Sequence, residues 1–163
     1  MMRAYDPNLL NKARISLAWM FEYAVHVYGV ALEVYYQQFL QSSISECFAS
    51  GDSSVLAGMS GAEMAYYVIH ENDPQVAMAE QIFGVNKSPE YWLGWALAYY
   101  QWYRNLPFGR ITEKIGIEGI LSLYPLYHEM DILHFVEALD EMRAGANSEA
   151  AQALYCRPED LLE

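Results

Sequence analysis

The segment from Ser88 to Arg104 constrains the fold more than any other part of the chain, because it has the features of a single helix with two unlike faces. Ser88 can cap the first free amides, Pro89 suits the first helical turn, and Glu90 complements the positive end of the helix dipole. These signals predict a helix that begins at Ser88 or Pro89 and reaches Arg104.

Seven of the thirteen residues from Tyr91 to Tyr103 are aromatic, and at 100° per residue their rings fall on one half of the helix. The other half carries Gly94 and Ala98, which would let a second helix approach closely. This aromatic arc of about 180° exceeds the roughly 100° that a surface helix usually buries. We therefore expect some of Tyr91, Tyr100 and Tyr103 to lie at the rim, where they can anchor a partner. Burial of all seven rings in the core is the alternative.

Apolar residues recur at helical spacing along most of the remaining chain. Prolines and glycines punctuate this pattern, and the sequence Ser60-Gly61-Ala62-Glu63 is a capping box. The predicted helical segments are residues 6–29, 30–48 with a break near Ser42 and Ser43, 60–71, two short pieces within 111–123 parted by Gly116, and an amphipathic helix from His128 to Gly145.

A chain of 163 residues fits one domain, and it contains no period-two alternation long enough to argue for a sheet. We predict an all-α fold, a single-domain irregular or orthogonal bundle of six to eight helices around the aromatic helix at about 89–104. Residues 1–145 form this helical domain. Residues 146–163 form an acidic C-terminal tail that can make a short helix.

The chain is strongly acidic, with 21 Asp and Glu residues against 9 Lys and Arg residues and a formal net charge of -12. Such a field repels phosphate backbones and anionic lipid surfaces, so we expect no direct nucleic-acid binding and no membrane binding. Residues 129–163 hold nine acidic and two basic residues. This charge either keeps the protein soluble or steers it toward a basic partner.

The cysteines give no sign of a metal site or a disulfide framework. Cys47 and Cys156 are far apart and match no metal-ligand spacing. The first residues show no basic region followed by an apolar run, and charged residues interrupt the apolar segment that starts at Ile15. We expect a cytoplasmic protein that uses no metal and no cofactor.

The residues best suited to catalysis cluster at the start of the last predicted helix: His128, Glu129, Asp131 and His134. A zinc-binding HExxH helix needs its second histidine at position 132, which is Ile132. His128 and Asp131 can share a face as an acid/base pair, but acids in a first helical turn ordinarily stabilise the helix end. We therefore predict that the protein is not an enzyme.

Three blocks of the sequence resemble a family of small, acidic, all-helical proteins of unknown function from gut bacteria. The blocks are Gly58-Met59-Ser60-Gly61 with Glu63, the segment Pro89–Trp102, and Tyr124-Pro125 followed by His128-Glu129 and Asp131. The likeness covers roughly residues 5–143. Genes of that family lie near small toxin-like proteins, including ones similar to ADP-ribosyltransferases. The resemblance implies a toxin-neutralising or accessory role and assigns no catalytic residues.

These observations predict a non-enzymatic cytoplasmic module that docks on a basic partner protein, as an antitoxin or inhibitor. The candidate partner-binding residues are Tyr91, Tyr100, Tyr103, Glu137, Asp140 and Glu141. In a first alternative, the acidic surface mimics nucleic acid and the protein is a phage or mobile-element inhibitor of a defence nuclease. In a second alternative, the protein is a small enzyme that uses His128 and Asp131 in a tyrosine-lined pocket.

Overall fold

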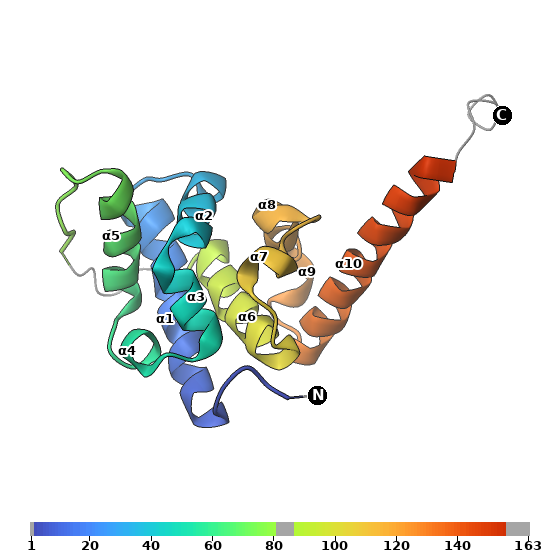
Figure 1. Ribbon diagram of the computed structural model, residues 1–163, viewed down its shortest axis with the longest axis horizontal. Coiled ribbons are helices and arrows are strands. Elements are labelled where there is room, and N and C mark those ends of the chain that lie inside the picture. Colours follow the sequence, from blue (N-terminus) through green and yellow to red (C-terminus); the bar gives the residue numbers. More distant parts are fainter. Residues whose placement is uncertain (1, 81–86, 156–163) are drawn as a thin grey trace.

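The computed structural model describes residues 2–80 and 87–155, with side chains up to residue 145, and every regular element in these ranges is helical (Figure 1). The elements are η1 (Pro7–Leu9), α1 (Leu10–Glu22), the π-helix η2 (Tyr23–Val27), α2 (Leu32–Gln41), α3 (Ser43–Ser50), α4 (Ser53–Leu56), α5 (Gly61–Asn72), α6 (Pro89–Arg104), α7 (Phe108–Ile111), α8 (Gly116–Leu121), α9 (Tyr124–Tyr127) and α10 (Ile132–Tyr155). In this part of the chain, six α-helices reach eight residues or more, and the predicted all-α fold is confirmed. No described helix is both long and apolar enough to span a bilayer.

The helix starts follow the local signals in the sequence. The Ser88 hydroxyl accepts a hydrogen bond from the Tyr91 amide at 3.3 Å and so caps α6. At the start of α5, the Ser60 hydroxyl accepts the Glu63 amide, and the Glu63 carboxylate accepts the Ser60 amide, which completes the predicted capping box. Ser42 has an extended backbone and separates α2 from α3, so the predicted break is also confirmed.

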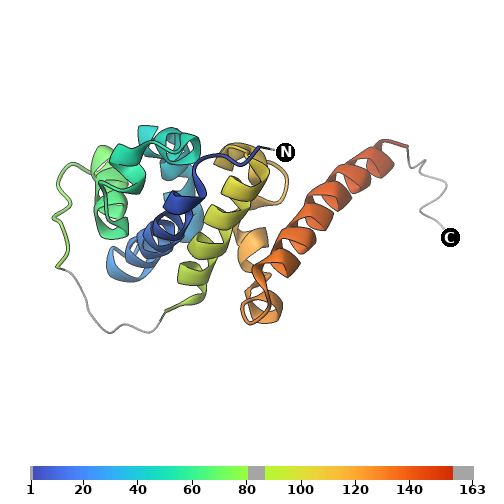
Figure 2. The same ribbon diagram turned by 90° about the horizontal axis from the view of Figure 1, so that it is seen from below.

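Helix α1 lies between α5 and α6, and glycines bring all three backbones together (Figure 2). A Cβ atom added to Gly94 of α6 would lie 2.4 Å from the carbonyl oxygen of Leu17. One added to Gly61 of α5 would lie 2.3 Å from the carbonyl oxygen of Ser16. The predicted close approach on the Gly94 face of α6 is confirmed, and α1 is the helix that makes it.

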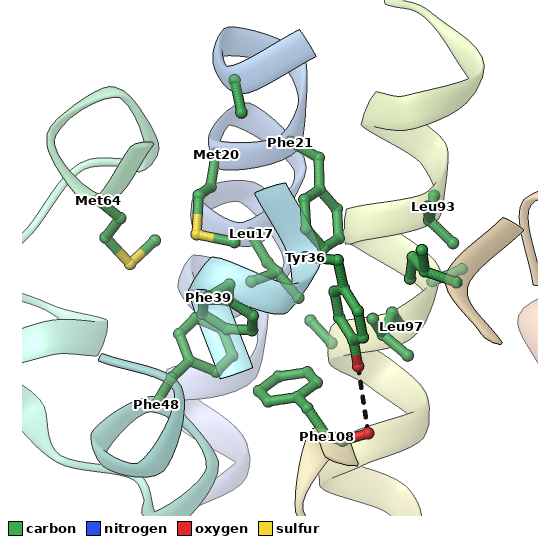
Figure 3. Packing of buried hydrophobic residues seen from close by; sticks show 14 of the residues in the cluster. Leu17, Met20, Phe21, Tyr36, Phe39, Phe48, Met64, Leu93, Leu97 and Phe108 are labelled. Atoms are coloured by element: carbon green, nitrogen blue, oxygen red, sulfur yellow. Dashed lines mark hydrogen bonds between the residues drawn. The ribbon is translucent and has the colours of Figure 1, made fainter. Parts of the chain in front are cut away.

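The core is built from the large apolar side chains that these helices turn toward α1 (Figure 3). Its fully buried aromatic rings pack edge to face or tilted, as between Phe39 and Phe108 at 5.2 Å between ring centres. The buried Tyr36 hydroxyl donates to the Phe108 carbonyl at 3.1 Å and contacts the Thr112 hydroxyl at 3.0 Å. Tyr36 therefore ties α2 to α7 without leaving its polar atom unpaired.

The last long helix differs from its prediction at both ends. It begins at Ile132 rather than His128, because Asp131 caps it by accepting the Leu133 amide at 2.9 Å. It also continues through Gly145 to Tyr155. Gly145 is not among the glycines with positive φ, and a glycine inside a helix costs only about 1 kcal/mol relative to alanine.

Only the first part of α10 packs on the body, through the buried side chains of Phe135, Val136, Ala138 and Leu139. The rest of the helix projects away from the other elements (Figures 1 and 2). The predicted tail thus starts inside a continuous helix. Its residues 156–163, including Cys156, lie outside the described residues.

Candidate functional site

The aromatic half of α6 is partly core and partly rim. Tyr100 is fully buried and Tyr91 is 9% exposed, whereas Tyr103, Trp95 and Tyr99 are half-buried at the edge of the core. Burial of all seven rings is therefore excluded. The assignment of Tyr100 as a partner-binding residue is corrected, because no part of its side chain is accessible to another molecule.

The chain covers these rings with its own cations. Five of the eight Lys and Arg residues in the described part of the chain lie over rings of α6: Arg3, Arg14, Lys87, Arg104 and Arg143. The closest contacts place the guanidinium carbon of Arg14 3.3 Å from the centre of the Trp95 ring and that of Arg3 3.5 Å from the Tyr103 ring. Burial lowers the pKa of Arg14 to about 10, which still leaves the side chain charged at neutral pH. Much of the rim is therefore already occupied by intramolecular contacts.

Asp140 joins α10 to the C-terminal end of α6. Its carboxylate accepts the Tyr100 hydroxyl at 2.6 Å and forms an ion pair with Arg104. Arg143 in turn donates to the Tyr100 hydroxyl at 2.9 Å. Burial and the hydrogen bond to Asp140 raise the pKa of Tyr100 to about 12. The structure thus gives Asp140 an internal role in place of the predicted one, whereas Glu137 and Glu141 are exposed.

A group of exposed apolar side chains occupies the turn from α9 into α10. Leu126 is 61% exposed, Met130 46% and Leu133 45%. Exposed acids accompany them along the chain, namely Glu129, Asp131 and Glu137. We call these six residues the α9–α10 corner. Of these six, the sequence predicted a partner-binding role for Glu137 but not for the apolar members, Leu126, Met130 and Leu133. Their position outside the buried pattern of α10 was the available signal.

A pocket of about 460 Å³ opens at the N-terminal end of α6, with aromatic walls formed by Tyr91, Trp92, Trp95 and Tyr124. Trp92 packs edge-on against Tyr124 at 5.7 Å between ring centres. His128 also lines the pocket and stacks on Tyr124 at 4.2 Å. We call this hollow the aromatic pocket.

The proposed acid/base pair is not assembled among the described residues. His128 donates from Nδ1 to the carbonyl oxygen of Tyr124 at 2.7 Å, and its Nε2 lies 3.7 Å from the Glu129 carboxylate. Asp131 caps α10 and shares no hydrogen bond with His128. Within residues 2–80 and 87–145, no three His, Cys, Asp or Glu side chains gather as a metal site would require.

A second, smaller hollow of about 210 Å³ has a different character, because its polar lining is mostly cationic. Arg110, Lys114 and Arg143 line it together with Glu113. Arg110 lies 3.8 Å from the Glu113 carboxylate, so part of this positive charge is offset within the hollow. We call it the cationic hollow.

Comparison of the chain with known protein families, with curated proteins and with solved structures finds no match. The family suggested by the three sequence blocks therefore stays a prediction.

Proposed function

We propose that this protein is a non-enzymatic binding module that docks on a positively charged protein partner through the α9–α10 corner. The observation that carries the proposal is the occurrence of three exposed apolar residues, Leu126, Met130 and Leu133, within eight positions of the chain, each nearly half exposed or more, with exposed carboxylates between and after them. Apolar side chains grouped on a surface mark interaction sites, and their burial supplies most of the energy of a protein interface.

Charge selects the partner. Residues 115–142 contain six acidic residues and no Lys or Arg. Arg104 pairs with Asp140, and the other five acids keep this region negative. Five of the basic side chains lie instead over the rings of α6. An acidic border around an apolar centre speeds encounter with a basic surface and disfavours acidic partners.

The resemblance of the three sequence blocks supports a narrower role, in which the partner is a toxin-like protein and this chain neutralises it. An inhibitor of this kind needs only to cover the partner's working surface. It needs no catalytic group of its own, and no acid/base pair forms between His128 and Asp131 in the described residues.

The experiment compares the wild type, a corner variant and a control variant. Each is used as bait in a lysate of the source cells, and the captured partner is then purified and titrated against each form. The corner variant carries Leu126→Ser, Met130→Ser and Leu133→Ser. The control variant carries Val34→Ser, Tyr67→Ser and Met78→Ser, which are equally exposed apolar residues elsewhere. We expect one basic protein whose Kd rises about tenfold or more in the corner variant and changes less than about twofold in the control.

Salt gives an independent readout, because surface charges are screened over about 8 Å at physiological ionic strength. The association rate with the partner should fall as salt is raised, and the corner variant should keep this salt dependence while its dissociation becomes faster. Equal binding by the corner variant and the wild type, or a partner that is acidic, would contradict the proposal.

A further inference from the structure

The aromatic pocket has the dimensions and walls of a small-molecule site. Its volume of about 460 Å³ falls within the range of roughly 300–1,000 Å³ that holds small ligands in proteins. Two of the rings that form its walls pack against other aromatic rings of the protein. Tyr91 packs edge-on against Trp19 at 5.1 Å between ring centres, and Trp92 packs edge-on against Phe135 at 5.2 Å. Rings held in this way form a site before any ligand arrives, and planar molecules stack on them.

The charge around the pocket is opposite to that of the protein as a whole. Among the described residues no Asp or Glu lines it, although the chain has 21 such residues, and its basic side chains are Lys87 and His128. The acids near the start of α6 are bound to other groups. Glu90 pairs with His26 at 3.0 Å, and Glu22 accepts the Ser88 hydroxyl.

The same arrangement disfavours a cationic ligand. Aromatic cages bind ammonium groups through the faces of their rings. Here the ammonium of Lys87, which itself lines the pocket, lies 4.9 Å from the centre of the Tyr91 ring. A second cation at this wall would meet positive charge.

We propose that the aromatic pocket binds a planar aromatic or heteroaromatic small molecule that carries an anionic group such as a carboxylate, sulfonate or phosphate. The ring lies among Trp92, Trp95 and Tyr124, and the anionic group faces Lys87. His128 also lines the pocket, with Nδ1 engaged by the Tyr124 carbonyl and Nε2 3.7 Å from the Glu129 carboxylate. This site shares no residue with the α9–α10 corner, so it does not depend on the docking proposal.

The test uses two probes that differ by one sulfonate group, the anion 1-anilinonaphthalene-8-sulfonate and its neutral counterpart N-phenyl-1-naphthylamine. Calorimetry and probe fluorescence measure the stoichiometry and Kd of each with the full chain. We expect one site that binds the sulfonate about tenfold more tightly than the neutral probe. Equal affinity for the two probes would overturn the assignment of an anionic ligand.

Two exposed lysines provide matched charge reversals. Lys87 lines the pocket, whereas Lys12 lies on α1 and does not. Lys87→Glu should weaken binding of the sulfonate about tenfold and leave the neutral probe within about twofold, and Lys12→Glu should leave both within about twofold. Equal effects of the two reversals would mean that net charge alone attracts the probe, and would also overturn the proposal.

Two further variants locate the probe. If Lys114→Glu abolishes sulfonate binding while Lys87→Glu does not, the cationic hollow is the site and the proposal fails. The proposal also fails if the corner variant loses sulfonate binding while Lys87→Glu keeps it.

Nuclear magnetic resonance locates the probe directly, because the chain has four tryptophans, each with one indole N–H resonance. Those of Trp92 and Trp95 should shift on titration, and that of Trp102, which donates to the Tyr5 carbonyl at 2.8 Å, should not.

Discussion

The two faces of α6 pack against the rest of the protein in different ways. On the face toward α1, Gly94 brings backbone against backbone, with no room even for one added carbon. On the aromatic face, long side chains such as Arg3 and Arg14 reach over the rings at distances from 3.3 to 5.9 Å. The first face depends on shape and the second on charge and stacking, so the first should be far less tolerant of substitution.

The largest expected effect comes from Gly94→Ala. The new Cβ would lie 2.4 Å from the Leu17 carbonyl oxygen and 2.7 Å from the Cα of Ala18, which are backbone atoms that cannot rotate away. We expect the free energy of unfolding to fall by about 3 kcal/mol or more and the Tm by about 6–12 °C. Denaturant and thermal unfolding followed by circular dichroism measure both.

Gly145→Ala is the control for this substitution, because a Cβ atom there meets nothing within 4 Å. In α10 the same change should stabilise the protein by about 0.5–1 kcal/mol through helix propensity alone. If both glycine variants shift stability by similar amounts, close packing on α1 is not what distinguishes the two faces of α6.

A smaller effect is expected from Arg14→Ala on the aromatic face. The variant loses the contact of the guanidinium with the Trp95 ring and the hydrogen bond from Nε to the Trp95 carbonyl oxygen at 3.3 Å. We expect a loss of about 1–2 kcal/mol in unfolding free energy. Lys12→Ala, at an exposed position on the same helix, should change stability by less than about 0.5 kcal/mol. A loss as large as that of Gly94→Ala would remove the distinction between the faces.

Alkaline pH tests the hydroxyl at the end of the aromatic face. The pKa of Tyr100 is raised to about 12 in the folded protein, against about 10 in an unfolded chain. Because the folded protein holds this proton more tightly than the unfolded chain, the protonated hydroxyl stabilises the fold. This stabilisation is complete below about pH 10 and is lost as the pH rises from about 10 to about 12. Tyr100→Phe should cost about 1 kcal/mol at neutral pH and flatten this decline. An unchanged alkaline slope in the variant would show that Tyr100 does not contribute to it.

The smallest effect is expected from Tyr99→Phe. Tyr99 stacks on Tyr103 at 5.6 Å between ring centres and is half-buried, and phenylalanine keeps the ring. Unfolding free energy should change by less than about 0.5 kcal/mol. A change above about 1 kcal/mol would indicate that the rim face is as closely specified as the face toward α1.

Local chemistry explains which parts of the fold were predictable from sequence. The cap at Ser88 and the capping box of Ser60 and Glu63 join groups only three residues apart, so the sequence displays both partners. The small face of α6 was predictable for the same reason, since Gly94 and Ala98 share a face by helical spacing alone. What that face packs against was not visible, because Leu17 is distant in sequence.

The errors involve contacts between distant residues. Asp140 looked like a free surface acid, because Arg104 and Tyr100 lie about 40 residues away and no local pattern pairs them with it. The cations that cover part of the aromatic rim were not foreseen for the same reason, because nothing in the sequence places Arg14 over Trp95. Gly145 looked like a stop because glycine often ends helices, yet an ordinary helical backbone is open to it as well.

The projecting part of α10 affects how the molecule moves in solution. At 1.5 Å per residue, the whole of α10, with 24 residues, is a rod about 36 Å long, and the part beyond Arg143 makes up about 18 Å of it. This extension is about half the diameter of a globular body of about 130 residues. A particle of this outline tumbles more slowly end over end than about its long axis. Nuclear spin relaxation should therefore differ between amides aligned with the rod and amides that lie across it.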